Sequence, residues 1–306
     1  MVHAMTTAER RAYRQVCRAD GRMLIVAADQ RGGMRKVLAD TDEEREAIDE
    51  ATLGTVKAAI VRHLANKASA VLLDPVCAVP GVVDEDVIDP GVGLLIGLDA
   101  SGFDTDANGY RNSRLVPDVP ARRVRELGGT GAKLLVYLRP DRADANDFNM
   151  GIIRECITGF AAEDVLLVVE ILTYRFDGES EEDYRAAFPG LVVECARMAL
   201  GAGSKVLKLP YPGTAEACRA ITKLCGGAPS AGGVPWAVLS AGVDHETFVG
   251  QVATAMENGA SGVIAGRALW KDCISLDADV RARRLEEIAS ERLAEIGRVL
   301  DAHPFR

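Results

Sequence analysis

Eight short apolar runs rich in β-branched residues recur along the chain, and amphipathic segments separate them. This alternation is typical of parallel βα units rather than of hairpins. Segments such as 42–67 and 244–260 are long enough, and amphipathic enough, to form crossover helices. The runs that we expect to be strands lie at residues 23–29, 70–74, 93–99, 132–138, 165–172, 205–211, 236–242 and 261–267.

Eight such units in one chain predict a closed (β/α)8 barrel of the α/β class. The alternative is an open doubly wound sheet, but the first run leads into DQRGGMRK, which lacks the G-x-G-x-x-G of dinucleotide-binding folds. We therefore expect one barrel domain over residues 1–306, with its strands between about 23 and 267 and a C-terminal helix at about 278–302.

Charge and cysteine content restrict the setting in which the protein works. The formal net charge of −9 argues against binding to nucleic acid or to an anionic membrane, because both need a basic surface. Seven scattered cysteines fit a reducing compartment, and neither a signal peptide nor a membrane-spanning run is recognisable. We expect a cytoplasmic protein.

Four ionisable residues interrupt or end the apolar runs, where a barrel places its functional groups: Asp29, Lys133, Glu170 and Lys208. Lys208 lies between two leucines, and burial disfavours an ammonium ion, so its amine could attack a carbonyl. A structural lysine paired with a core carboxylate is the alternative. The presence of all four in one lumen favours a site, with Glu170 as proton shuttle and Lys133 holding a substrate oxygen.

The last two predicted strands end in LSAGVD and IAGRALW, where barrels commonly bind phosphate. Backbone N–H groups near Ser240, Gly242 and Gly266 could approach an anion, and Arg267 could bind it through two N–H groups. Two tight strand-to-helix turns would explain the same glycines without any ligand.

The polar segment 100–119 is expected to be a long loop that acts as a lid, and one of its arginines, Arg114 among them, could bind a second anion. Its DTDANG stretch imitates half of a calcium-binding loop but lacks the final glutamate. The four histidines have no ligand spacing, so we expect no catalytic metal, and no organic cofactor is indicated.

The motifs VAADQRG, AVLLDPV, GAKLLVYL, VVEILTY, KVLKLPYP, VLSAGVD and GVIAGRALW together resemble the tagatose 1,6-bisphosphate aldolase family of class I aldolases. The related sulfofructosephosphate aldolases are similar too. The resemblance implies that Lys208 forms a Schiff base, with Glu170 as acid and base and Lys133 and Asp29 beside them. It implies a phosphate site made by Ser240, Gly242, Gly266 and Arg267, with Gln30 and Arg31 at the same mouth.

The expected reaction is cleavage of a phosphorylated ketose, such as tagatose 1,6-bisphosphate, into dihydroxyacetone phosphate and a three-carbon aldehyde. Asp29 and Glu170 are the candidates to take the C4 hydroxyl proton. The sequence does not identify the acid that protonates the enamine, for which Tyr137 and Tyr174 are candidates. A 6-sulfonated ketose phosphate, giving sulfolactaldehyde, is the nearest alternative. A barrel that senses sugar phosphates for a regulatory partner and an isomerase that forms no adduct are the others. We expect a small-molecule substrate and a homo-oligomer.

Overall fold

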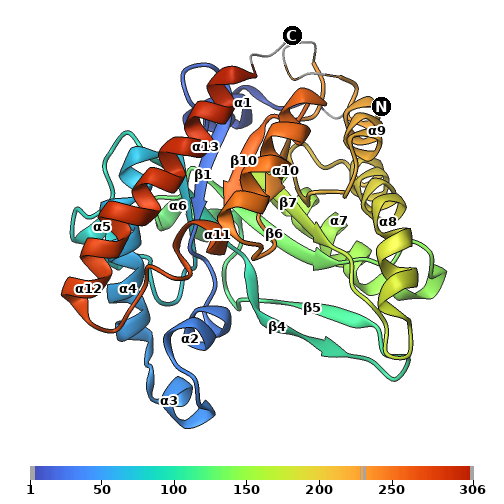
Figure 1. The fold of residues 1–306 in the computed structure, drawn as a ribbon. Helices are drawn as coiled ribbons and strands as arrows, with labels where there is room; N and C mark the ends of the chain where they lie inside the picture. The colour runs from blue at the N-terminus through green and yellow to red at the C-terminus, as the bar shows by residue number, and fades with distance from the viewer. Residues whose placement is uncertain (1–3, 228, 230–231, 304–306) are drawn as a thin grey trace.

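The computed structural model describes residues 4–227, 229 and 232–303, and shows a closed barrel of eight parallel strands ringed by helices (Figure 1). Each of the eight predicted runs forms one strand, so the barrel is confirmed. Around the ring the order is β1-β10-β9-β8-β7-β6-β3-β2. The strands are β1 (Met23–Ala27), β2 (Ala70–Leu73), β3 (Gly93–Gly97), β6 (Gly131–Tyr137), β7 (Leu166–Leu172), β8 (Leu207–Pro210), β9 (Trp236–Leu239) and β10 (Gly262–Ala265).

The apolar runs form barrel strands because both of their faces are buried. In β1, Met23, Ile25 and Ala27 belong to a cluster in the barrel interior, whereas Leu24 and Val26 belong to the larger cluster between strands and helices. A strand's side chains alternate between its two faces, so two layers of core demand a continuous apolar run.

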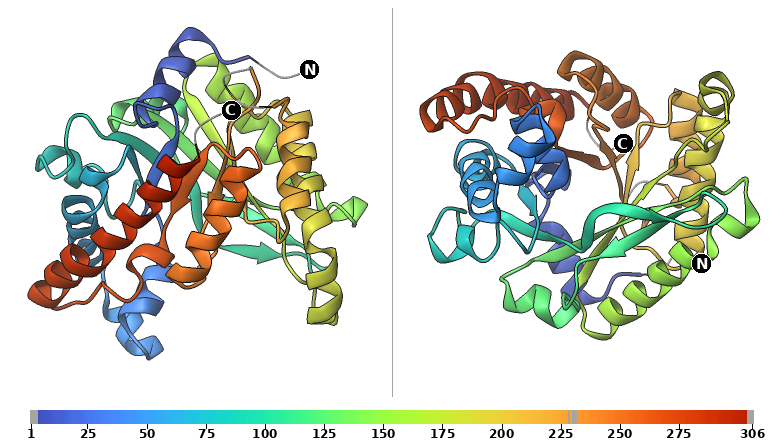
Figure 2. Two further views of the ribbon diagram at one scale, coloured as in Figure 1. Left: turned by 45° about the horizontal axis from the view of Figure 1, so that its top comes forward. Right: turned by 90° about the horizontal axis from the view of Figure 1, so that it is seen from below.

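The helices occupy the segments between strands and surround the barrel (Figure 2). Many begin at a Ser, Thr or Asp whose side chain accepts a hydrogen bond from the first turn, as Asp244 does from the Thr247 N–H. The helices up to the last strand and directly after it, capped or not, are α1 (Thr7–Gln15), α2 (Gly32–Leu38), α3 (Asp42–Ala47), α4 (Glu50–His63), α5 (Gly81–Asp84), α6 (Ala121–Glu126), α7 (Asp147–Ala162), α8 (Glu181–Gly201), α9 (Ala215–Leu224), α10 (His245–Glu257) and α11 (Arg267–Trp270).

The predicted C-terminal helix is present as three consecutive pieces: α12 (Ala278–Arg284), a π-helical turn (Leu285–Ala289) and α13 (Ser290–Ala302). Its buried residues, including Leu293 and Ile296, join the core between the helices and the barrel. Among the described residues, no helix has the length and apolar character needed to cross a bilayer.

The segment after β3 is a hairpin, not the open polar loop expected from its composition. β4 (Asp99–Thr105) and β5 (Arg111–Leu115) pair antiparallel at the carboxyl end of the barrel, which Figure 2 shows end-on in its right-hand view. Asp106 shapes the turn by accepting hydrogen bonds from the Asn108 and Tyr110 N–H groups. The strands are polar because much of the hairpin is exposed, so the apolar signal used to find strands was absent.

The ring closes where β10 pairs with β1, and Gly262 permits this close approach. Gly262 lies opposite Met23 with φ of +135°, and a Cβ there would overlap the Met23 backbone. Gly262→Ala should therefore destabilise the protein by at least about 3 kcal/mol, measured by urea unfolding.

Gly250→Ala is the matched control, because Gly250 lies on the exposed face of α10 with no heavy atom near its added Cβ. That change should stabilise the protein slightly, by about 0.5 to 1 kcal/mol. Equal stability of the two variants would show that the closing contact is less tight than described.

Candidate active site

A cavity of about 630 Å³ opens at the carboxyl end of the strands, and the four charged residues predicted from sequence line it. Lys133, Glu170 and Lys208 lie on β6, β7 and β8, and Asp29 follows β1 by two residues. Residues far apart in the chain meet here because the strands close into a ring. Lys133, Glu170 and Lys208 are almost fully buried. The structure thus brings the four predicted residues together in one cavity.

Lys133 lies at the centre of this cluster. Its Nζ is 2.7 Å from Asp29 Oδ2, 2.7 Å from Asp99 Oδ1 and 3.0 Å from Glu170 Oε2. The same Glu170 oxygen is 2.8 Å from Lys208 Nζ. One carboxylate oxygen thus joins the two lysines, and the five side chains form a continuous ionic network.

The network shifts the pKa values of Lys133, Asp29 and Asp99. Burial alone would lower the pKa of Lys133, but the charges of Asp29, Asp99 and Glu170 raise it well above its ordinary value, so Lys133 stays an ammonium ion. Burial would raise the pKa of Asp29, yet Lys133 and Lys208 hold it at about 2. For Asp99 burial prevails, helped by the charges of Asp29 and Glu170, and its pKa is raised.

Sequence reasoning missed Asp99. It ends the third apolar run of the sequence, as Asp29 ends the first, and that shared position was the available signal. In the structure Asp99 begins β4, lines the cavity and contacts Lys133. The hairpin therefore starts inside the site.

The residues predicted to bind phosphate come together at the ends of β9 and β10. Ser240, Gly242, Gly266 and Arg267 all line the cavity, and the Gly266 N–H lies 3.4 Å from Ser240 Oγ. Gly242 has φ of +85°, and a Cβ there would be 3.1 Å from the Arg267 guanidinium carbon. A side chain at 242 would crowd the guanidinium, so glycine keeps this corner open.

Gln30 and Arg31 also line the cavity. Gln30 Nε2 donates to Asp29 Oδ1 at 3.0 Å, and Arg31 donates to the Asp99 carbonyl at 3.3 Å. Arg114 is not among the cavity-lining residues. It lies on β5, half-exposed, and contacts the Ser101 carbonyl and Asp104 on the neighbouring strand.

The two tyrosines named as proton donors occupy different places. Tyr137, at the end of β6, lines the cavity, and burial raises the pKa of its hydroxyl. Tyr174 is not among the cavity-lining residues, and its hydroxyl accepts a hydrogen bond from the Arg111 N–H. The Arg111 guanidinium packs against Tyr137, Tyr174 and Phe103, with its carbon 4.2 Å from the centre of the Phe103 ring. The hairpin is thus held against the cavity wall.

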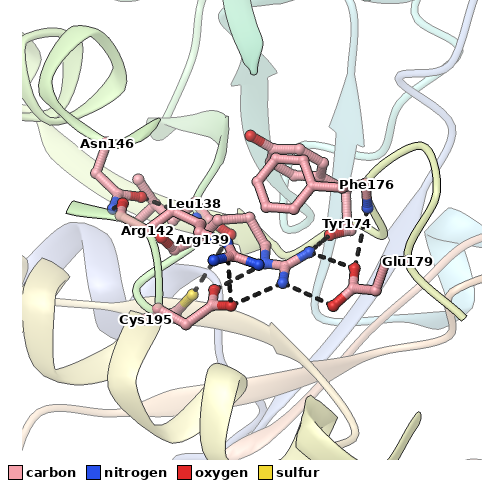
Figure 3. Close-up of polar contacts among 9 residues, drawn as sticks. Leu138, Arg139, Arg142, Asn146, Tyr174, Phe176, Glu179 and Cys195 are labelled. Atoms are coloured by element: carbon pink, nitrogen blue, oxygen red, sulfur yellow. Dashed lines mark hydrogen bonds and ion pairs between the residues drawn. The ribbon is translucent and has the colours of Figure 1, made fainter. Parts of the chain in front are cut away.

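Arg139 ties the ends of β6 and β7 together, as Figure 3 shows. Its fully buried guanidinium forms paired contacts of 2.7 to 2.9 Å with Asp141 and Glu179, and donates to the Tyr174 carbonyl at 2.6 Å. It also lies 4.2 Å from the centre of the Phe176 ring. These contacts immobilise the segments that follow Lys133, Tyr137 and Glu170.

Comparison with known proteins agrees with this geometry. The sequence model described as "DeoC/LacD family aldolase" matches residues 23–272, which include all eight strands. The chain belongs to the DeoC/LacD aldolase family. It is a class I aldolase, that is, a carbon–carbon lyase.

Two relatives are named tagatose 1,6-diphosphate aldolase. The protein from Streptococcus agalactiae is 26% identical, with 97% of this chain and 96% of the relative covered. That from Staphylococcus aureus is 28% identical, with 86% and 84% covered.

Solved structures share the fold at lower identity. A fructose-bisphosphate aldolase from Slackia heliotrinireducens has a TM-score of 0.65 at 18% identity, covering 97% of this chain and 89% of that one. An archaeal fructose-1,6-bisphosphate aldolase, solved with its catalytic lysine bound to a carbinolamine intermediate, has a TM-score of 0.60 at 19% identity, covering 94% and 98%.

Lys133→Met should destabilise the protein by about 3 to 5 kcal/mol at neutral pH, because it removes the ammonium ion that contacts Asp29 and Asp99 and leaves Glu170 with Lys208 alone. Because the pKa of Lys133 is raised in the folded protein, Lys133 stabilises the fold at every pH below the pKa that it has in the unfolded chain. The full loss of unfolding free energy therefore appears at pH 7. In the variant the carboxylates bind protons more readily than in the unfolded chain. Urea unfolding should therefore show a smaller deficit at about pH 5 than at about pH 8.

Lys67→Met provides the control, because Lys67 is exposed and its 2.8 Å contact with Glu286 lies at the surface. Its effect should stay below about 1 kcal/mol at either pH. A Lys133 variant as stable as this control would contradict the central role of the network.

Proposed function

We propose that this aldolase cleaves a ketose phosphate with an anionic group at each end, with tagatose 1,6-bisphosphate as the first candidate. The products would be dihydroxyacetone phosphate and a three-carbon aldehyde. The observation that carries the proposal is the buried Lys208 amine, which reaches the cavity with Glu170 as its polar contact at 2.8 Å. The names of the two curated relatives support the choice of sugar.

The phosphate next to the carbonyl would bind at the ends of β9 and β10. Arg267 lines this corner and has no carboxylate partner among the residues that the structure describes, so its charge is available to an anion. Ser240 and the backbone around Gly242 and Gly266 supply further donors. Because β8 neighbours β9, a phosphate held here places the adjacent carbonyl within reach of Lys208.

The contact between Lys208 and Glu170 supplies the proton movements of Schiff-base formation. The Lys208 ammonium passes one proton to Glu170 and becomes a neutral amine, which attacks C2 of the ketose. The nitrogen then gives one of its two remaining protons to the C2 oxygen, which becomes the hydroxyl of a carbinolamine. The protonated Glu170 then gives that proton to the C2 hydroxyl, which leaves as water, and an iminium ion remains. Lys133 remains a cation throughout and holds Glu170 in place at 3.0 Å.

After the C3–C4 bond breaks, the enamine must gain a proton at C3. Tyr137 fits this step because it lines the cavity and its raised pKa keeps it protonated at neutral pH. Hydrolysis of the iminium then releases dihydroxyacetone phosphate and restores Lys208.

The other end of the substrate would meet Arg31, Lys36 and Ser101. These residues line the cavity beside α2 and the start of the hairpin, and the Gly32 N–H donates to Ser101 Oγ. Within the described ranges, neither Arg31 nor Lys36 has a carboxylate partner. Two unpaired cations suit a phosphate and would also suit a sulfonate, so substrate assays must separate the two.

Borohydride reduction in the presence of dihydroxyacetone phosphate should add the mass of the reduced adduct to the wild-type protein and place it on Lys208. Lys208→Ala should show no adduct, whereas Lys205→Ala, which removes the lysine bound to Glu9 at the opposite end of the barrel, should keep it. The absence of an adduct on the wild type would sink the Schiff-base proposal and favour an isomerase or a sensor.

A panel of tagatose 1,6-bisphosphate, fructose 1,6-bisphosphate and 6-deoxy-6-sulfofructose 1-phosphate should identify the substrate. We expect the highest kcat/KM for tagatose 1,6-bisphosphate, and we expect Arg31→Ala to raise KM about tenfold or more. Preference for the sulfonated sugar would reassign the distal group while leaving the lysine chemistry intact. Adduct formation without cleavage of any sugar would point to a sensor.

A further inference from the structure

Building on the proposed function, we propose that Asp99 is the base that takes the proton from the C4 hydroxyl when the C3–C4 bond breaks. Neither the sequence motifs nor the comparisons assign it a role. The assignment rests on its place in the barrel, its free oxygen and the engagement of the other carboxylates.

Asp99 lies on the side of the cavity where C4 must be. The ring order places β3, which leads directly into Asp99, four strands from β9 in either direction, so the two face each other across the barrel. A substrate whose first phosphate binds at the ends of β9 and β10, and whose C2 is bonded to Lys208, extends C4 away from that corner. C4 of the substrate is therefore directed toward Asp99.

Asp99 also has an oxygen available for the substrate. Its Oδ1 contacts Lys133, whereas Oδ2 has no hydrogen-bond partner in the part of the chain that the structure describes. Of the three carboxylates around Lys133, Asp99 has the most exposed side chain, 19% against 7% for Asp29 and 6% for Glu170.

The other two carboxylates are already committed. Asp29 binds Gln30 through Oδ1 and Lys133 through Oδ2, so both oxygens are occupied. Its pKa of about 2 also makes it a weak base. Glu170 contacts Lys208 directly and serves the loss of water. Asp99, whose pKa is raised by burial and by its two carboxylate neighbours, is the stronger base of the two aspartates.

The step balances without any other reactant. The C4 hydroxyl proton moves to Asp99 Oδ2, and the O–H electrons become the second bond of the new C4 carbonyl. The C3–C4 bonding electrons form the C2–C3 double bond, and the iminium electrons return to nitrogen, giving a neutral enamine on Lys208. In the condensation direction, protonated Asp99 returns the proton to the aldehyde oxygen.

The test measures two activities of the Asp99→Asn variant separately: enamine formation and sugar cleavage. Exchange of the C3 hydrogen of dihydroxyacetone phosphate for deuterium from D2O, which NMR measures, requires the Schiff base and the enamine but no C4 hydroxyl. Cleavage of the sugar that the wild type prefers requires both. We expect D99N to lose cleavage by about 100-fold or more while deuterium exchange and borohydride trapping stay within about threefold of wild type.

Two further variants serve as controls for D99N. Asp104→Asn, on the same strand but 65% exposed and remote from Lys133, should retain both activities. Tyr137→Phe should differ from D99N by slowing deuterium exchange as well as steady-state cleavage, because both need the proposed proton donor to C3.

The proposal is overturned if D99N cleaves the sugar at a rate near that of wild type. It is also overturned if D99N loses exchange as severely as cleavage, since Asp99 would then act only by holding Lys133. If Asp29→Asn, and not D99N, loses cleavage selectively, the base is Asp29. Failure of the wild type to form any adduct would instead overturn the proposed function.

Discussion

The contact of one buried ammonium with three carboxylates is the interaction on which the site depends. Lys133 brings together Asp29, which follows β1, Asp99 at the start of β4 and Glu170 on β7. Through Glu170 the network reaches Lys208 on β8. Burying these carboxylates without a cation would cost several kcal/mol each, so the network is stable only as a whole. The three carboxylates also differ in the chemistry that they can perform, because each has different partners.

The rest of the mouth is built to hold this network still. Arg139 fastens the segments that follow β6 and β7, and the aromatic residues around Arg111 hold the hairpin against the same wall. None of these contacts touches Lys208. They restrict the positions of Tyr137 and of the hairpin that begins at Asp99. Catalysis needs such groups placed to within about half an ångström.

The barrel and much of the site were predictable from the chain. Continuous apolar runs revealed all eight strands, since both faces of a barrel strand are buried. A charged residue inside such a run, like Lys208 or Glu170, is costly without a purpose and was therefore conspicuous. The hairpin was not predicted because half-exposed antiparallel strands carry polar residues. Arg114 was expected to bind an anion because the composition of a segment does not show how exposed a side chain is or which groups it contacts.

The sequence by itself determined the strand pattern, the lysine on β8 and the glycines that permit close approach at β9 and β10. Only the tertiary structure decided which charges meet. Asp29 and Asp99 follow apolar runs in the same way, yet one has both oxygens occupied and a pKa of about 2, whereas the other keeps an oxygen free and a raised pKa. The difference arises because a carboxyl group's acidity is set by neighbours that ring closure brings together from distant parts of the chain.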